Sequence, residues 1–164
     1  MQTIESADGT LLAVEVRGEG PPLLLVSGGS ADLHNWDRVT PLLAPHFRTL
    51  CVDRRGRGAS EDRSVAGGDD LAREVEDLNA VIGYVGEPAH VLGHSGGAVC
   101  VLEAALQGAD VRTLVLYEPP VHVSAEFPRG LGDRLQPFAD AGDMDGLLVT
   151  FLREGRGSPK PKSR

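Results

Sequence analysis

Short runs of apolar residues recur along much of the chain, separated by longer stretches of mixed polarity. Most of these runs are continuous and do not alternate with polar residues, which is typical of strands covered on both faces. A sheet of that kind is parallel and carries helices on either side. The predicted strands are residues 11–17, 23–26, 47–52, 89–92 and 113–117.

The segments between these runs have helical spacing. Residues 70–85 place apolar side chains on one helical face, Asp69 or Asp70 can cap the helix, and Gly86 followed by Pro88 ends it. Shorter helices are predicted over 36–43 and 97–107. The repeated order of strand, helix and strand predicts an α/β fold with a doubly wound, mostly parallel sheet.

Length and charge narrow the class of protein. The 164 residues suit one domain, and 41% hydrophobic content is ordinary for a globular core. The net charge is −8, with no basic cluster in the body, so we expect a small-molecule partner rather than nucleic acid or an anionic membrane.

Cysteine usage and the N-terminal sequence predict a cytoplasmic location. Cys51 and Cys100 lie inside apolar runs without metal-ligand spacing, so we interpret them as buried free thiols of a reducing compartment. The N-terminus has no signal-peptide pattern, and no run approaches the ~20 apolar residues of a membrane span.

The end of the chain differs from its body. Lys160 and Lys162 are the only lysines, and residues 155–164 have no apolar face to bury, so this tail is predicted to be disordered. Three origins stay open: a premature or out-of-frame end of a longer gene, a sequence added by cloning, and a natural flexible tail.

The motif that carries chemistry is Gly93-His94-Ser95-Gly96-Gly97, which follows a predicted strand and opens a predicted helix. A G-x-S-x-G sequence in that setting forms a strained turn that lifts the serine above the sheet. The N–H of Gly96 then points toward a developing oxyanion at the helix N-terminus. His94 adjoins Ser95, but neighbours on a tight turn point apart, so we expect a structural role for it.

Three further segments appear in order with this motif. They are Leu-Leu-Leu-Val-Ser-Gly-Gly-Ser over 23–30, Asp-Arg-Arg-Gly-Arg-Gly-Ala-Ser over 53–60, and Leu-Val-Leu-Tyr-Glu-Pro-Pro over 114–120. With them the chain resembles the α/β-hydrolase family over roughly residues 10–122. The second segment is similar to the family's D-x-R-G-x-G-x-S loop, which we expect to shape the site.

The resemblance implies an α/β-hydrolase sheet with strands one to six and without the last two strands. It divides the chain into a core over 1–122, a partial cap over 123–154 and the tail over 155–164. The sheet would then end on an exposed edge, which favours self-association and makes the isolated chain marginal in stability.

Site residues follow from the same resemblance. Ser95 is the predicted nucleophile, the backbone amides of Gly29 and Gly96 are the predicted oxyanion donors, and no metal or cofactor is implied. The family usually has His-Gly where this chain has Ser27-Gly28. The candidate substrate contacts are Ser30, His34 and Trp36.

The acid and the base of a triad are harder to place. Glu118 follows the predicted sixth strand, where a subset of the family carries its acid, so it is a candidate acid or a pocket-lining carboxylate. The family takes its base from a histidine after the eighth strand, and here no histidine follows His122. A base at His122 would be novel.

The sequence therefore predicts a serine hydrolase for a small-molecule ester or related acyl compound, impaired as this chain. The alternative is a non-catalytic hydrolase-like binding module or an inactive fragment.

Overall fold

The computed structural model describes residues 1–63, 70–121 and 130–154. The predicted tail, His122 and the first residues of the predicted cap lie outside these ranges. The chain forms two compact units, Met1–Pro120 and Val121–Arg164, which are treated separately below.

The first unit contains a six-stranded sheet in the order β1-β2-β4-β3-β5-β6. β2 pairs antiparallel with β1 and β4, whereas β4, β3, β5 and β6 are parallel to one another. The doubly wound, mostly parallel sheet is thus confirmed. The strands are β1 Gln2–Glu5, β2 Leu11–Arg17, β3 Pro22–Val26, β4 Arg48–Val52, β5 Ala89–His94 and β6 Val111–Tyr117.

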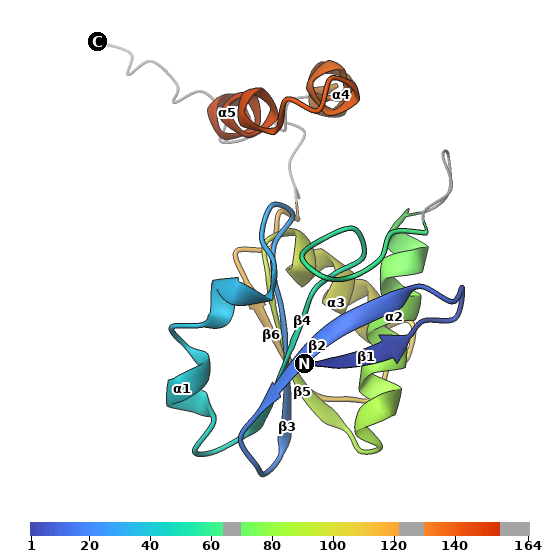
Figure 1. Ribbon diagram of the computed structural model, residues 1–164, viewed down its shortest axis with the longest axis vertical. Helices are drawn as coiled ribbons and strands as arrows, with labels where there is room; N and C mark the ends of the chain where they lie inside the picture. Colours follow the sequence, from blue (N-terminus) through green and yellow to red (C-terminus); the bar gives the residue numbers. More distant parts are fainter. Residues whose placement is uncertain (64–69, 122–129, 155–164) are drawn as a thin grey trace. The chain divides into compact units, whose positions relative to one another are not determined.

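Helices cover both faces of this sheet. The 3-10 helix η1 (Leu33–Trp36) and α1 (Thr40–Leu43) lie on one face, and α2 (Asp70–Val85) and α3 (Gly96–Leu106) lie on the other (Figure 1). The prediction of a single helix over 36–43 is wrong, because η1 ends at Trp36 and α1 begins only at Thr40. Pro41 has no N–H to continue a helix but suits a first turn.

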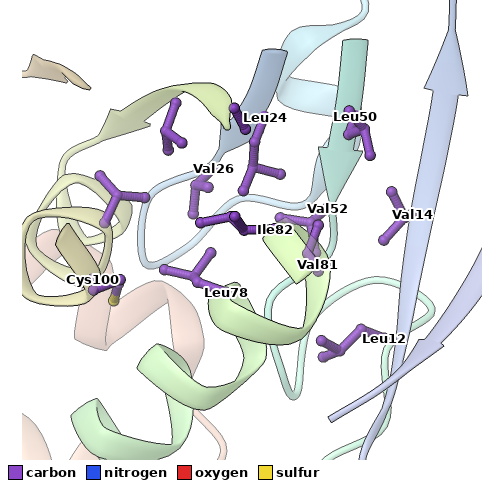
Figure 2. Close-up of a cluster of buried hydrophobic side chains, with 14 of the residues drawn as sticks. Leu12, Val14, Leu24, Val26, Leu50, Val52, Leu78, Val81, Ile82 and Cys100 are labelled. Atoms are coloured by element: carbon purple, nitrogen blue, oxygen red, sulfur yellow. The ribbon is translucent and has the colours of Figure 1, made fainter. Parts of the chain in front are cut away.

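The larger core lies between the sheet and helices α2 and α3 (Figure 2). Alternate side chains of the strands meet the apolar stripe of α2, and burying one such side chain contributes about 1.5–3 kcal/mol. Its central members include Leu24, Val26, Leu50, Val52, Leu78, Val81 and Ile82. A smaller cluster on the opposite face contains Leu23, Leu25, Leu33, Trp36 and Cys51.

The far end of the sheet is open along β6. Among the described residues, β6 pairs only with β5. Val115 is 45% exposed and Tyr117 57% exposed, so apolar surface accompanies the unpaired edge. Such an edge offers free backbone groups to another strand.

The second unit is described as a pair of helices, α4 (Leu131–Asp140) and α5 (Met144–Glu154). Arg134 Nε donates to Glu154 Oε2 at 2.5 Å and joins the two helices. Met144, Leu148 and Phe151 are exposed on α5. None of the helices within the described ranges combines the length and the hydropathy that crossing a membrane requires.

Candidate functional site

The candidate site lies where the order of the strands in the sheet reverses. β3 has β4 on one side and β5 on the other. The connection after β3 therefore leads to one side of this strand, and the connection after β4 crosses to its other side. Open α/β sheets bind ligands in the crevice at such a point. Here the loop after β3 and the turn after β5 meet.

The turn after β5 holds Ser95 in a strained backbone conformation, with φ 51° and ψ −123°. The Ser95 N–H donates to the carbonyl of Tyr117 at 2.9 Å, which ties the turn to β6. A Cβ on Gly93 would lie 2.6 Å from the Ala98 Cα. The first glycine of the motif therefore allows α3 to fold back against β5, as the sequence predicted.

The loop after β3 packs against the turn at Ser95. A Cβ on Gly28 would lie 3.2 Å from the Ser95 Cβ, so the loop after β3 packs directly on the turn. A Cβ on Gly96 would lie 3.5 Å from the Gly29 nitrogen. The structure thus brings Gly29 and Gly96 together at the N-terminus of α3, where the helix dipole favours negative charge.

A third loop, after β4, fastens the loop after β3. The buried Asp53 carboxylate accepts hydrogen bonds from the N–H groups of Leu33 (2.7 Å) and Ala59 (2.8 Å). A Cβ on Gly58, which has φ +53°, would lie 2.1 Å from an Asp53 carboxylate oxygen, so only glycine fits. Asp53 and Gly58 therefore shape the loop, as expected from their motif.

Buried ion pairs fasten the same loop to α2. Arg54 binds the Glu74 carboxylate through Nε at 2.8 Å and through Nη2. Arg55 binds Asp77 at 2.8 and 2.6 Å, which raises the pKa of this arginine, and it also contacts Asp8 at 3.0 Å. Removing one partner of such a buried pair leaves an uncompensated charge and costs about 3–5 kcal/mol.

Glu118 follows β6 directly and is exposed. Its φ is 48°, and within the described residues only Ser95 and Glu118 combine a positive φ with a side chain. Strained conformations of this kind cluster at functional sites. The two are linked through the Tyr117 carbonyl, which accepts from Ser95 and precedes Glu118. The role of Glu118 as triad acid stays a prediction.

The candidate substrate contacts have different surroundings. Ser30 is exposed, whereas Trp36 is 7% exposed and packs in the smaller core cluster. His34 Nδ1 lies 3.1 Å from an Asp37 carboxylate oxygen, and this hydrogen bond raises the pKa of His34. The roles of Ser30, His34 and Trp36 in substrate binding stay predictions.

His94 stacks on Tyr117, with the ring centroids 5.2 Å apart and the planes at 30°. This contact fits the structural role expected for it. In the described part of the chain, no group of three or more His, Cys, Asp or Glu side chains could hold a metal ion.

Arg57 is a residue at the site that the motifs did not single out. Its Nε donates to the Gly29 carbonyl at 2.7 Å, and its Nη1 donates to the Arg55 carbonyl at 2.9 Å. Position 57 is unspecified in the D-x-R-G-x-G-x-S pattern, so its positive charge was the one signal available at this position.

Comparisons with known proteins agree with this geometry. The model of the alpha/beta hydrolase family matches residues 23–162. An alpha/beta hydrolase from Sphaerobacter thermophilus superimposes with a TM-score of 0.87 at 38% identity, covering 97% of this chain and 62% of that one. The esterase RhEst1 from Rhodococcus is 32% identical with a TM-score of 0.64, covering 70% and 44%.

An N-formylmaleamate deformylase from Pseudomonas putida is 37% identical over 107 residues, which is 63% of this chain and 39% of that protein. The chain therefore spans less than two thirds of the length of each of these relatives.

Proposed function

Because the chain belongs to the alpha/beta hydrolase family, we propose that Ser95 is the nucleophile of an acyl transfer to water. The Ser95 Oγ attacks a substrate carbonyl carbon, and the carbonyl oxygen becomes an oxyanion that accepts hydrogen bonds from the Gly29 and Gly96 amides. The leaving group departs, and water then attacks the acyl-serine and releases the acid.

One observation supports this proposal above the others: a serine with φ 51° stands at the end of β5, with the Gly29 nitrogen close to Gly96. A serine nucleophile beside backbone N–H donors is the arrangement that stabilises a developing oxyanion. Removing one such donor typically lowers the catalytic rate constant by about 100- to 1000-fold.

The general base is the missing part. Serine needs a base within hydrogen-bond reach, and no histidine follows His122 in the 164 residues. His34 is engaged with Asp37, and His94 stacks on Tyr117. With Glu118 as candidate acid and no base assigned, we expect the 164-residue chain by itself to be impaired.

A small-molecule ester or related acyl compound is the proposed substrate. Two relatives have names that fit this class, one a deformylase and one an esterase. The proposal includes no metal or cofactor, and a cytoplasmic location stays a prediction from the sequence.

A fluorophosphonate probe with added imidazole tests the proposal, because imidazole in solution can replace a missing histidine as base. We expect slow labelling of the 164-residue chain, faster labelling with imidazole, and none in Ser95→Ala. Labelling that persists in Ser95→Ala would refute the nucleophile. Fast labelling without imidazole that is lost in Ser95→Ala would refute the missing base.

The lack of a late histidine also favours a second candidate, a non-catalytic hydrolase-like binding module or an inactive fragment. If imidazole fails to promote labelling of Ser95, this candidate gains. The coding sequence beyond residue 155 separates its two forms: further strand-like runs and a late histidine in another frame indicate a fragment.

The open edge of β6 supports a further proposal, self-association through this strand. Val115 and Tyr117 expose apolar surface next to unpaired backbone groups. We expect Val115→Lys to shift the chain toward monomer in sedimentation velocity. Leu106→Lys, which changes an exposed leucine at the end of α3, is the matched control. Equal behaviour of the two variants would argue against the β6 interface.

A further inference from the structure

Arg57 connects two loops of the candidate site. Its side chain starts in the loop after β4, and its Nε reaches the carbonyl of Gly29 at 2.7 Å in the loop after β3. A second bond, from Nη1 to the Arg55 carbonyl at 2.9 Å, anchors the guanidinium to its own loop. Arg57 therefore links the loop after β4 to Gly29, the residue whose N–H is an oxyanion donor in the proposed function.

The partners of this guanidinium are unusual for its neighbourhood. Nearby arginines bind carboxylates: Arg54 pairs with Glu74, and Arg63 pairs with Glu61. Across the described ranges, by contrast, Arg57 makes no ion pair. Its fork of donors is directed at neutral backbone carbonyls although the chain has 24 acidic and 16 basic residues.

Gly29 is a residue that needs such a contact. A Cβ built on it would meet nothing within 4 Å, and the residue is exposed, so packing does not restrain it. Glycine also has the largest backbone freedom to lose. An oxyanion donor nevertheless has to stay within about 2.7–3.1 Å of the reacting oxygen.

Among the described residues, the side-chain hydrogen bonds of this loop other than that of Arg57 lie toward its two ends. Ser27 Oγ donates to the Asp32 carbonyl at 2.8 Å, and the Leu33 N–H binds Asp53. The bond between Ala31 and Gly28 is long, at 3.4 Å. Within the part of the chain that the structure describes, Arg57 is the side chain that hydrogen-bonds to Gly29 itself.

We propose that Arg57 is a positioning residue that fixes the Gly29 carbonyl and so restrains the backbone that carries the Gly29 N–H near Gly96. This inference rests on the proposed function of Gly29 as an oxyanion donor. Arg57 does not touch the reacting atoms and acts through the loop that it holds.

Nuclear magnetic relaxation of backbone ¹⁵N in the 164-residue chain tests the bracing directly. We expect order parameters of about 0.85 for Gly29 and Ser30 in the parent and below about 0.6 in Arg57→Ala, with the strands unchanged. Arg63→Ala removes an exposed arginine of the same loop and should leave the parent values. Arg57→Lys keeps one donor and should restore part of the order.

The reactivity of Ser95 supplies the second readout. With imidazole present, Arg57→Ala should slow fluorophosphonate labelling at least tenfold relative to Arg63→Ala. Unchanged order at Gly29 and Ser30 in Arg57→Ala overturns the inference. A different outcome separates the two proposals. If the order parameters of Gly29 and Ser30 fall in Arg57→Ala but the probe never labels Ser95 in any variant, the role of Arg57 is supported and the proposed function is refuted. If Arg57→Ala does not fold, Arg57→Gln carries the same comparison.

Discussion

Replacing Gly97 with alanine tests how closely α3 packs against β3. Gly97 is the second residue of α3 and is buried, and a Cβ there would lie 2.3 Å from the Ser27 carbonyl oxygen and 2.7 Å from that of Val26. Carbon and oxygen normally approach to about 3.3 Å, so one backbone must move by roughly 1 Å. Both obstacles are backbone atoms at the exit of a central strand, which cannot swing away as a side chain can.

The expected cost follows from two opposing effects. Overpacking of this kind costs about 1–3 kcal/mol, and rigid backbone neighbours put Gly97→Ala near the top of that range. Alanine in place of glycine in a helix returns up to about 1 kcal/mol. The free energy of unfolding should therefore fall by about 2 kcal/mol.

Gly83→Ala is the matched control because it makes the same change in α2, where a Cβ would meet nothing within 4 Å. It should raise the free energy of unfolding by up to about 1 kcal/mol. The two variants then differ by about 3 kcal/mol, more than 100-fold in the unfolding constant, which urea titrations with equal m-values resolve. Equal or greater stability of Gly97→Ala relative to the parent would refute the close approach.

Three further predictions concern ionisable side chains. The Thr10 N–H, which donates to the Asp8 carboxylate at 3.0 Å, and the Arg55 guanidinium hold the pKa of Asp8 well below its usual range, so the stabilisation from this carboxylate is complete above about pH 4 and lost as pH falls through its folded pKa. In Asp8→Asn, the urea midpoint should depend less on pH below about pH 4 than in the parent. The same slope of midpoint against pH in both proteins would contradict this. Burial raises the pKa of Cys100 to about 11, so Ellman's reagent at pH 8 should modify it only in urea. Asp53→Ala leaves the Leu33 and Ala59 N–H groups unsatisfied and should cost at least about 2 kcal/mol, while exposed Asp110→Ala should cost almost nothing.

The sequence predicted those parts of the fold that a local pattern encodes. Continuous apolar runs marked β3, β4 and β5 because side chains on both faces of these strands are buried or half-buried. A run also marked β6, although its alternate residues Thr113, Val115 and Tyr117 are exposed. β1 gave no run because Ile4 is its one buried residue. The single helix predicted over 36–43 failed because η1 ends at Trp36 and α1 begins at Thr40, whose hydroxyl donates to the Trp36 carbonyl.

In the candidate site, too, features set by neighbouring residues could be predicted, whereas features set by residues far apart in the sequence could not. The strained turn at Ser95 could be predicted because its glycines lie within two residues of it and act locally. The bond from Asp53 to Leu33 and that from Arg57 to Gly29 join residues 20 and 28 positions apart. No spacing rule covers such pairs, so the bracing of the loop after β3 became visible only in three dimensions.

These contacts also indicate which part of the site depends most on its surroundings. The loops after β3 and β4 are tied to the core through Asp53 and to α2 through Arg54 and Arg55. The turn at Ser95 instead donates its N–H to Tyr117 on β6, the strand with an open edge. A positive φ at a residue with a side chain costs about 1–3 kcal/mol and persists only while neighbouring structure enforces it. Because Ser95 and Glu118 both carry this strain, we expect a perturbation of β6 to affect the proposed nucleophile more strongly than the loop after β3.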